Sequence, residues 1–380
     1  MHITVAMDSF KGSLSSQDAG NAVKRGILQA MPHADVAVFP LADGGEGTVQ
    51  ALYKTLGGQW IHTTVTGPLG NPVEAGYCIL PDGTAVLEMA AAAGLPLVPP
   101  EARDPLKTTT FGVGELIRHA ISRDCRNFIV GIGGSATNDG GTGMLTALGY
   151  KFLDKNENPI PPGAKSLESL HHIRTEQGLP ELADCHFRIA CDVTNPLCGA
   201  NGCSAIFGPQ KGATPQMVAD IDIWLSHYAE IAAKVSAKAD PNYPGAGAAG
   251  GLGFAFLTFT NAVLESGADI ILSQSGLEQQ IRHTDLVITG EGRLDGQTAM
   301  GKGPIKIAEL AKKHEKPVIA LCGCVGTDVQ RCNEQGIDAY FPILQTVTTL
   351  DEALATENAR HNLTATATQV FHLISTLGRK

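Results

Sequence analysis

The sequence predicts an α/β protein in which a doubly wound parallel sheet, discontinuous in the chain, receives an inserted mixed α/β domain. Strands followed by polar loops and amphipathic helices recur at both ends of the chain, whereas the middle alternates short strands with turn signals. The 380 residues exceed the usual size of one hydrophobic core. Only 5% of residues are aromatic and 44 are glycine, which favours sheets of small aliphatic side chains joined by tight loops.

The N-terminal part of the chain contains two consecutive strand–loop–helix units. Apolar side chains alternate along residues 2–7 and predict a strand, after which Ser15 or Ser16 caps a helix. A second strand is expected at residues 35–41, again followed by a helix. Two such units in succession predict parallel strands with both polar loops at the same edge of the sheet.

The middle of the chain follows a different pattern. Residues 60–89 consist of short apolar runs separated by Gly, Pro and Asn turn signals, which predicts an antiparallel meander. Helices are expected at residues 112–122 and 215–234, with a strand at 186–190 between them. A glycine-rich stretch at 245–253 closes this part.

From residue 284 the alternation of strands and helices returns. Strands are expected at 285–289, 317–322 and 339–343, with helices at 304–313, at 328–335 and from about 350. We therefore predict that residues 1–80 and 284–380 build one Rossmann-like domain, into which residues 81–283 are inserted as a mixed α/β domain. The active site is expected in the cleft between the two domains, a common location for small-ligand sites.

Composition excludes several classes of partner. The net charge of −10 argues against a nucleic acid or an anionic membrane surface. The start of the chain, MHITVAMDSF, lacks the basic residues and long apolar core of a secretion signal, and the most apolar stretches are too short to span a bilayer. Nine cysteines without a C-x-x-C pair predict reduced thiols. We expect a cytoplasmic protein that binds small molecules; its oligomeric state stays open, a homodimer included.

A glycine-rich loop follows a buried strand near the middle, in the stretch NFIVGIGGSATNDGGTGML of residues 127–145. A strand, a glycine loop and a helix in this order aim backbone N–H groups at an anion. The spacing matches neither G-x-G-x-x-G nor a Walker loop, and a tight turn is the structural alternative. Asp139 is suited to capping the helix or to holding a metal bound to the anion. The candidate nucleotide-binding residues of this loop are Gly133, Gly134, Ser135, Asn138 and Asp139.

Three other strand-end loops combine acids with glycines or cations. They are DSFKGS at 8–13, DGGEGT at 43–48, and GEGRLDGQ at 290–297 followed by Lys302. Phosphoryl transfer needs this mixture because acids hold Mg²⁺ while Lys or Arg neutralises charge on the transferred group. Helix caps and surface ion pairs are the structural alternatives. Two or more of four carboxylates are expected to bind Mg²⁺, directly or through water: Asp8, Asp43, Glu46 and Glu291.

The remaining candidates would act on the transferred group or on the acceptor. Either Lys11 or Arg293 is expected to stabilise the moving phosphoryl group, with the other clamping a substrate carboxylate. Asp192 follows a predicted strand and is suited to taking the proton of an attacking hydroxyl, or simply to starting a turn. The further binding candidates are Gly44 and Gly45 for the nucleotide and Ser9, Asn195 and Lys302 for the substrate. Two lysines near glycine or proline are expected to be solvated: Lys107 and Lys211.

Six motifs, in order along nearly the whole chain, resemble those of the bacterial glycerate kinases of class I. They are AMDSFKGSLSS, PLADGGEGT, GIGGSATNDGGTGML, ACDVTNPLCG, GAGAAGGLGFAF and VITGEGRLDGQTAMGKGP. The resemblance implies ATP-dependent phosphorylation of D-glycerate to 2-phosphoglycerate. It also implies a discontinuous Rossmann-like domain with an inserted second domain. It supplies no catalytic map, so the residue roles above rest on the chemistry of the side chains.

Two other functions are compatible with this kind of sheet. A Rossmann-like oxidoreductase would carry G-x-G-x-x-G after its first strand, and this chain has none there. A non-catalytic protein that binds small carboxylates would not need separate acids at several strand ends. Absorbance of a bound cofactor would identify the first, and Mg²⁺-dependent consumption of ATP would exclude the second.

Overall fold

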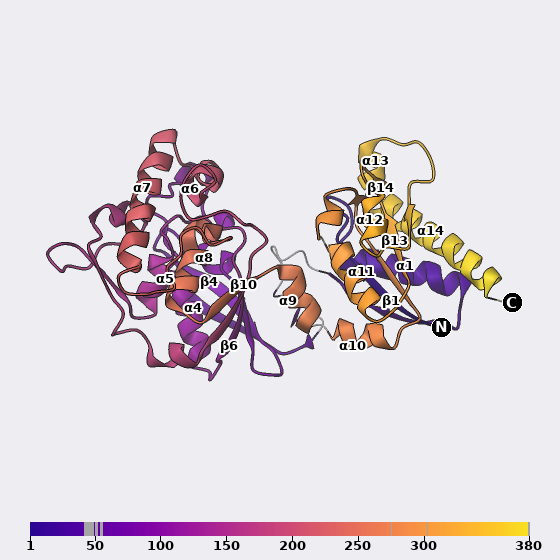
Figure 1. The fold of residues 1–380 in the computed structure, drawn as a ribbon, viewed down its shortest axis with the longest axis horizontal. Helices are drawn as coiled ribbons and strands as arrows, with labels where there is room; N and C mark the ends of the chain where they lie inside the picture. Colours follow the sequence, from indigo (N-terminus) through magenta and orange to yellow (C-terminus); the bar gives the residue numbers. More distant parts are fainter. Residues whose placement is uncertain (42–48, 50–51, 54–55, 275, 302, 379–380) are drawn as a thin grey trace. The chain divides into compact units, whose positions relative to one another are not determined.

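The computed structural model describes residues 1–41, 49, 52–53, 56–274, 276–301 and 303–378. The chain divides into two compact units (Figure 1). We call Met1–Asp43 with Ile271–Lys380 the discontinuous unit, and Gly44–Ile270 the continuous unit. Each contains a sheet with parallel strands and helices packed on it, so the predicted α/β fold class is confirmed.

The sheet of the discontinuous unit has five parallel strands in the order β15-β13-β11-β1-β2. The strands are β1 (His2–Met7), β2 (Asp35–Val38), β11 (Leu286–Gly290), β13 (Val318–Cys322) and β15 (Ala339–Pro342). The chain leaves β1 for β2 on one side and returns to β11 on the other. The topological switch point therefore lies between β1 and β11, where open α/β sheets bind their ligands.

Helices cover both faces of this sheet (Figure 1). The apolar side chains of Val5 and Ala6 point to opposite faces because side chains alternate along a strand. Val5 belongs to a cluster with α1 (Ser16–Ala30) and α14 (Thr356–Leu377), and Ala6 to one with α10 (Leu277–Arg282) and α11 (Gly303–Lys313). The smaller elements are α12 (Arg331–Glu334), α13 (Leu350–Leu354) and the pair β12 (Arg293–Leu294) and β14 (Cys324–Val325).

Helix α1 follows the predicted pattern closely. Ser15 caps it, since its hydroxyl accepts a hydrogen bond from the backbone N–H of Asp18 at 3.1 Å. The buried apolar side chains lie on one face, and α14 packs against the helix. Gly26 makes the close approach feasible, because a Cβ at this position would lie 2.4 Å from the carbonyl oxygen of Thr364.

The continuous unit is built on a sheet of six strands in the order β10-β9-β6-β5-β4-β3. The strands are β3 (Gln59–Thr66), β4 (Pro72–Ile79), β5 (Ala85–Glu88), β6 (Asn127–Gly131), β9 (His186–Ala190) and β10 (Ala262–Glu265). The first three are antiparallel, as the meander prediction requires, but β5 also pairs in parallel with β6. The parallel order then continues through β9 to β10.

Two segments lie in a different unit from the one that the sequence indicates. Residues 59–79 form β3 and β4, which join the larger sheet because β4 pairs with β5. Residues 271–282 belong to the discontinuous unit, where Leu277 and Ile281 of α10 join the same hydrophobic cluster as α11. The first of these boundaries depends on the parallel pair of β5 with β6, two strands that are distant in sequence, and turn signals alone do not reveal such a pair.

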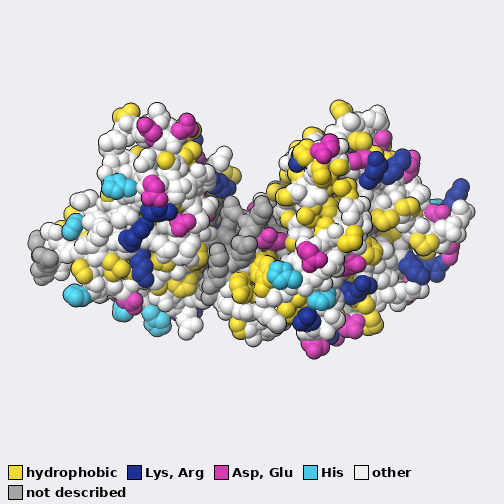
Figure 2. Space-filling model, turned by 180° about the vertical axis from the view of Figure 1, so that it is seen from behind, with side chains coloured by type: hydrophobic (Ala, Val, Ile, Leu, Met, Phe, Trp, Pro, Cys, Tyr) yellow, Lys and Arg dark blue, Asp and Glu magenta, His cyan; other side chains and the backbone are white. Residues whose placement is uncertain are grey.

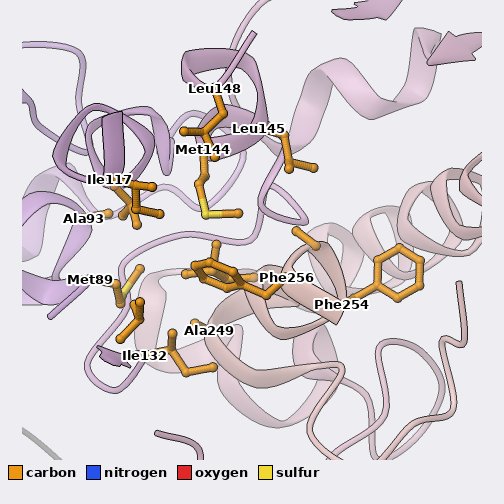
Figure 3. Close-up of a cluster of buried hydrophobic side chains, with 14 of the residues drawn as sticks. Met89, Ala93, Ile117, Ile132, Met144, Leu145, Leu148, Ala249, Phe254 and Phe256 are labelled. Carbon is orange, nitrogen blue, oxygen red and sulfur yellow. The ribbon is translucent and has the colours of Figure 1, made fainter. Parts of the chain in front are cut away.

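The helices of the continuous unit cover its sheet and the loops at the strand ends. They are α3 (Ala90–Ala93), α4 (Phe111–Ile121), α5 (Thr142–Ala147), α6 (Cys203–Phe207), α7 (Pro215–Ala232) and α8 (Ala248–Phe259), with α9 (Gly267–Gln274) at the border of the two units. A small hairpin pairs β7 (Lys151–Leu153) with β8 (His172–Arg174). In the core, Met144 of α5 and Phe256 of α8 meet Met89 and Ile132 (Figure 3).

The surface carries mixed side chains. On the face shown in Figure 2, acidic and basic side chains are interspersed, with no large block of one sign among the described residues. Within the described part of the chain, no helix is both long enough and apolar enough to cross a membrane. All nine cysteines are free thiols, in line with the predicted reduced state.

Candidate functional site

The switch point of the discontinuous unit brings two predicted loops together. Met7 pairs with Gly290, so the loops that start at Asp8 and Glu291 leave the sheet side by side. Asp8 is 9% exposed, and its carboxylate accepts the backbone N–H of Ser9 at 2.6 Å. A Cβ at Gly303 would lie 3.2 Å from Asp8 Oδ2, so the start of α11 faces this carboxylate.

The loop after β11 is held by its own hydrogen bonds. Glu291 Oε1 accepts the hydroxyl of Thr298 at 2.5 Å. Asp295 Oδ1 accepts the backbone N–H of Gln297 at 2.9 Å, and Asp295 Oδ2 lies 3.3 Å from Arg293 Nε. Because the Arg293 side chain is 64% exposed, this ion pair contributes little to stability and leaves the guanidinium facing solvent.

The predicted magnesium site is only partly described. Asp43, Gly44, Gly45, Glu46 and Lys302 lie outside the described residues. Within the described ranges, no group of three or more His, Cys, Asp or Glu side chains is placed to hold a metal ion. The two described candidates, Asp8 and Glu291, are carboxylates at adjacent strand ends, which fits the oxygen ligands that Mg²⁺ takes. The magnesium site stays a prediction.

In the continuous unit, the glycine loop after β6 offers a row of hydrogen-bond donors. Gly133 and Gly134 are exposed, and Gly134 has φ +71°. Among the hydrogen bonds of the described residues, none is donated by the backbone N–H of Gly133, Gly134 or Ser135. Successive N–H groups next to a left-handed residue form a concave anion-binding surface. The loop is therefore suited to hold a phosphate or a carboxylate.

Neighbouring segments hold this loop in place. Gly134 O accepts the N–H of Leu95 at 2.8 Å, and the N–H of Ala136 donates to Ala93 O at 2.9 Å. On the other side, the hydroxyl of Thr108 donates to Ala136 O at 2.8 Å. These bonds use the carbonyl groups of Gly134 and Ala136 and the N–H of Ala136, and they leave the N–H groups of residues 133–135 for a ligand.

Lys211 is a buried residue beside this loop that sequence reasoning assigned to the solvent. It was expected to be solvated, but it is 2% exposed, so that prediction is wrong. Its ammonium donates to Ser135 Oγ at 2.8 Å, Thr137 O at 2.7 Å and Asn138 Oδ1 at 3.1 Å. Burial lowers the pKa of Lys211 to about 8, against the opposing effect of Cys203 and Asp139.

The local chain explains why Lys211 points inward. Residues Pro209–Lys211 form a 3₁₀ turn that ends at Gly212 with φ +92°. A Cβ at Gly212 would lie 2.3 Å from Arg103 O, so the turn packs directly on another segment. Lys211 is buried only because of this packing between parts of the chain that are far apart in sequence. The nearby Gly and Pro of GPQKG were the one local signal.

Asp139 and Asn138 lie inside the protein. The Asp139 carboxylate accepts the N–H of Thr110 at 2.8 Å, the hydroxyl of Thr110 at 2.9 Å and the N–H groups of Gly141 and Gly143 at 3.1 and 3.3 Å. Burial raises its pKa, and these hydrogen bonds oppose the rise. Asp139 thus caps α5 and ties it to the start of α4, while Asn138 donates to Ser204 Oγ at 3.2 Å. Both side chains shape the loop from within.

The glycine-rich start of α8 backs the loop. Ala249, Gly250 and Gly251 all have positive φ, and Gly250 O accepts the N–H of Gly140 at 3.0 Å. A Cβ at Gly250 would lie 2.0 Å from Thr137 O, so only glycine fits at this contact. Behind it, the hydrophobic cluster of Figure 3 joins α5 to α8. The motifs at 131–145 and 245–256 therefore form one structural unit.

The strand next to β6 supplies the predicted base. Gly131 pairs with Ala190, so the Asp192 loop begins beside the glycine loop. Asp192 is exposed, and its Oδ1 accepts the N–H of Gly267 at 3.1 Å. Asn195 Nδ2 donates to Asn201 O at 2.8 Å. The structure thus brings Asp192 to the same sheet edge as Gly133, Gly134 and Ser135.

Comparison with known proteins identifies the family. The sequence model of the "Glycerate kinase family" matches residues 3–375. This chain belongs to the glycerate kinase family. It is 50% identical to "Glycerate 2-kinase" of Escherichia coli K12 over 93% of each chain, and 47% identical to "Glycerate kinase" of Haemophilus influenzae over 99% of each chain. A crystal structure assigned as glycerate kinase 2 from Salmonella typhimurium LT2 matches it with a TM-score of 0.88 and 45% identity, over all of both chains.

The family membership confirms the resemblance drawn from the six motifs and the prediction that the chain is an enzyme of the kinase class. The roles of individual residues stay predictions. For this glycerate kinase family member, the described candidates fall into two groups. Asp8, Ser9, Lys11, Glu291 and Arg293 lie at the switch point of the discontinuous unit, and Gly133, Gly134, Ser135, Asp192 and Asn195 at one sheet edge of the continuous unit.

Proposed function

We propose that this protein transfers the terminal phosphoryl group of ATP to the 2-hydroxyl of D-glycerate, giving 2-phospho-D-glycerate. The observation that carries the proposal is the set of backbone N–H groups at residues 133–135, which donate no hydrogen bond among the described residues and lie at the exposed Gly133 and Gly134, because both substrates are oxyanions. The position of the transferred group is supported by the relative named glycerate 2-kinase, at 50% identity. The location of the active site between the domains, the cytoplasmic location and the oligomeric state stay predictions.

Mg²⁺ would be held by two or more of four carboxylates. Asp8 and Glu291 follow neighbouring strands, and Asp43 and Glu46 are the further candidates from the sequence. When bound, the ion would neutralise negative charge on the phosphate oxygens of ATP. Lys11 or Arg293 would add positive charge at the same group, and the other would hold the carboxylate of glycerate. Ser9, Asn195 and Lys302 are the proposed contacts to the acceptor.

Asp192 is the proposed base. Its exposed carboxylate would accept the proton of the 2-hydroxyl as that oxygen attacks the phosphorus, and the nucleotide would leave as ADP. Gly133, Gly134 and Ser135 would bind an oxyanion through their N–H groups. Asn138 and Asp139 would support the same loop from inside the protein, which revises their expected role as direct contacts.

The Asp192→Asn variant tests the base. Asparagine still accepts the N–H of Gly267, so the fold should be kept while turnover falls by roughly 10²–10⁴, the usual contribution of a general base. The Michaelis constant for glycerate should change little. Asp222→Asn is the matched control, because Asp222 also accepts a glycine N–H, that of Gly199 at 2.9 Å, but lies on α7. Turnover of Asp192→Asn within about threefold of the wild type would exclude this role.

The decisive assay measures Mg²⁺-dependent ATP consumption with D-glycerate and with a panel of other small hydroxy acids. Phosphorus NMR of the product distinguishes phosphorylation of the 2-hydroxyl from that of the 3-hydroxyl. Binding of glycerate without ATP consumption would favour the carboxylate-binding alternative. A visible or near-ultraviolet cofactor band in the purified protein would favour an oxidoreductase. Phosphate on the 3-hydroxyl would contradict the proposed product and leave the kinase assignment intact.

A further inference from the structure

Lys211 is a buried cation whose three hydrogen bonds all go to neutral oxygen atoms. They are a serine hydroxyl, a backbone carbonyl and an asparagine amide oxygen. Among the ion pairs of the described residues, none includes Lys211. Moving an ammonium group out of water costs several kcal/mol, and neutral acceptors compensate less than a carboxylate does. A lysine in this position therefore lowers the stability of the folded protein, which points to a functional role for its charge.

All three acceptors belong to one short segment, residues 135–138. This segment directly follows the exposed residues Gly133 and Gly134 and directly precedes the buried carboxylate of Asp139. The lysine thus fixes the side of the loop that faces the protein interior. Because residues 135–138 directly follow Gly133 and Gly134, holding this segment in place also restricts the position of those two glycines.

Ser135 links the two sides. Its oxygen accepts a hydrogen bond from Lys211, so its own hydroxyl hydrogen stays available to donate. Among the described hydrogen bonds, Ser135 Oγ donates none. The hydroxyl therefore adds a fourth donor to the N–H groups of residues 133–135, and the nearby ammonium makes the whole group more attractive to an anion.

We propose that Lys211 is a positioning residue, which holds residues 133–135 and the Ser135 hydroxyl in the shape that binds an oxyanion. The proposal rests on the proposed function for the identity of that oxyanion, which is either a phosphate of ATP or the carboxylate of glycerate. In this inference Lys211 does not touch the ligand, because its side chain is buried and its ammonium donates to three protein oxygens. Its charge and its hydrogen bonds act through the loop.

The groups that set the charge of Lys211 come from several elements. Asp139 lies on the loop itself and Cys203 on α6, and both favour the charged form. Tyr228 of α7 lies near Asp139, and its pKa is raised well above its ordinary value by burial and by that carboxylate. The Arg103 segment contacts the turn of Lys211 through its backbone.

The test compares three variants of the full-length protein by calorimetric titration with ATP, D-glycerate and pyrophosphate, together with steady-state kinetics. Lys211→Met removes the ammonium and keeps the length of the side chain. Ser135→Ala removes the hydroxyl, and with it one of the three acceptors of Lys211, and keeps the ammonium. Lys238→Met is the matched control, because Lys238 also donates to a backbone carbonyl, Thr260 O at 3.1 Å, but lies away from the loop.

We expect Lys211→Met to weaken binding of one of the two substrates by at least about tenfold, the loss of a hydrogen bond to a charged group, and Ser135→Ala to weaken the same substrate less. Lys238→Met should bind as the wild type does. Wild-type affinity should also fall above about pH 8, with the fall absent in Lys211→Met. Loss of ATP affinity would identify the oxyanion as a phosphate, and loss of glycerate affinity would identify it as the carboxylate.

A folded Lys211→Met variant with unchanged affinities and an unchanged pH profile would overturn the inference. If that variant does not fold, unchanged affinities in Ser135→Ala would overturn it. The pyrophosphate titration separates this inference from the proposed function. Pyrophosphate binding that requires Lys211 supports the oxyanion loop even in a protein without kinase activity, whereas a wild type that binds none of the three ligands overturns it.

Discussion

Asp139 and Lys211 are buried groups of opposite charge at the glycine loop after β6, and each is stabilised in a different way. The carboxylate of Asp139 accepts three backbone N–H groups and the hydroxyl of Thr110, and it thereby ties the start of α5 to the start of α4. The ammonium of Lys211 donates to three neutral oxygens. At the scale of single residues, two buried groups of opposite charge, Asp139 and Lys211, therefore hold the loop from inside the protein.

Asp139→Asn should destabilise the continuous unit. The amide nitrogen of asparagine would face the N–H groups of Thr110 and Gly143 or of Gly141, and donors that face donors leave all of them unsatisfied. We expect a loss of about 3 kcal/mol in the free energy of unfolding, measured with urea. Asp154→Asn is the control: Asp154 accepts two N–H groups in a surface turn, where water replaces lost bonds. Equal effects of the two substitutions would contradict the role of Asp139.

The buried lysine also predicts how stability depends on pH. Burial lowers the pKa of Lys211 from 10.5 to about 8, so between these values the unfolded chain binds a proton that the folded protein does not. Stability should therefore rise with pH in this window, by up to about 1.4 kcal/mol per pH unit. Cys203 and Tyr228 act in the opposite direction at higher pH, because burial raises their pKa values.

Comparison with Lys211→Met isolates the lysine, since both proteins keep the cysteine and the tyrosine. The stability difference between wild type and variant, from urea unfolding at roughly pH 7, 8 and 9, should grow in favour of the wild type above pH 8. Parallel curves would mean that the pKa of Lys211 is close to its ordinary value in the folded protein.

Local signals identified some of these residues and not others. Asp139 was recognised as a cap candidate because an Asp between glycines before an apolar helix is a local pattern, and Ser15 was recognised for the same reason. Lys211 was assigned to the solvent because nothing within a few residues of it differs from an exposed lysine. Its partners lie about 75 residues away in sequence, and only tertiary packing brings them together.

At the scale of elements, periodicity predicted well where an element has one buried face. Strand β1 and helix α1 match their predicted ranges, because alternation and helical spacing record which face is buried. The start of α8 was seen only as a glycine-rich stretch. Its three residues with positive φ depend on contact with Gly140, and no periodicity encodes such a contact. The short strand β10 was not predicted, although Asn261 and Ser266-Gly267 flank it.

Gly26→Ala tests the packing of α1 on α14. Alanine favours an isolated helix over glycine by about 1 kcal/mol. Here the added methyl group would lie 2.4 Å from Thr364 O, and overpacking against backbone costs about 1–3 kcal/mol. We expect a net loss of stability, measured as a lower melting temperature. Asn21→Ala, at an exposed position of the same helix, should keep or raise it. A higher melting temperature for Gly26→Ala would show that the two helices can separate at little cost.

At the scale of the whole molecule, sheet topology explains why one unit is discontinuous in sequence. Strand β1 lies between β2 and β11, so the sheet of the discontinuous unit needs both ends of the chain. The sequence predicted this arrangement from the return of strand–helix units after residue 284. It did not predict that β3 and β4 extend the other sheet, because strand pairing across a turn and strand pairing across a domain border give the same local pattern.

This topology predicts that the two parts of the chain differ in their ability to fold alone. Residues 44–270 contain every strand of their sheet and a single large hydrophobic cluster, so a fragment of this range should unfold cooperatively in urea. Residues 271–380 lack β1 and β2, which leaves β11 as an unpaired edge, and lack α1, against which α14 packs. That fragment should show little fixed structure by near-ultraviolet circular dichroism and should aggregate. Cooperative unfolding of 271–380 alone, or its absence in 44–270, would contradict this argument from the sheet topology.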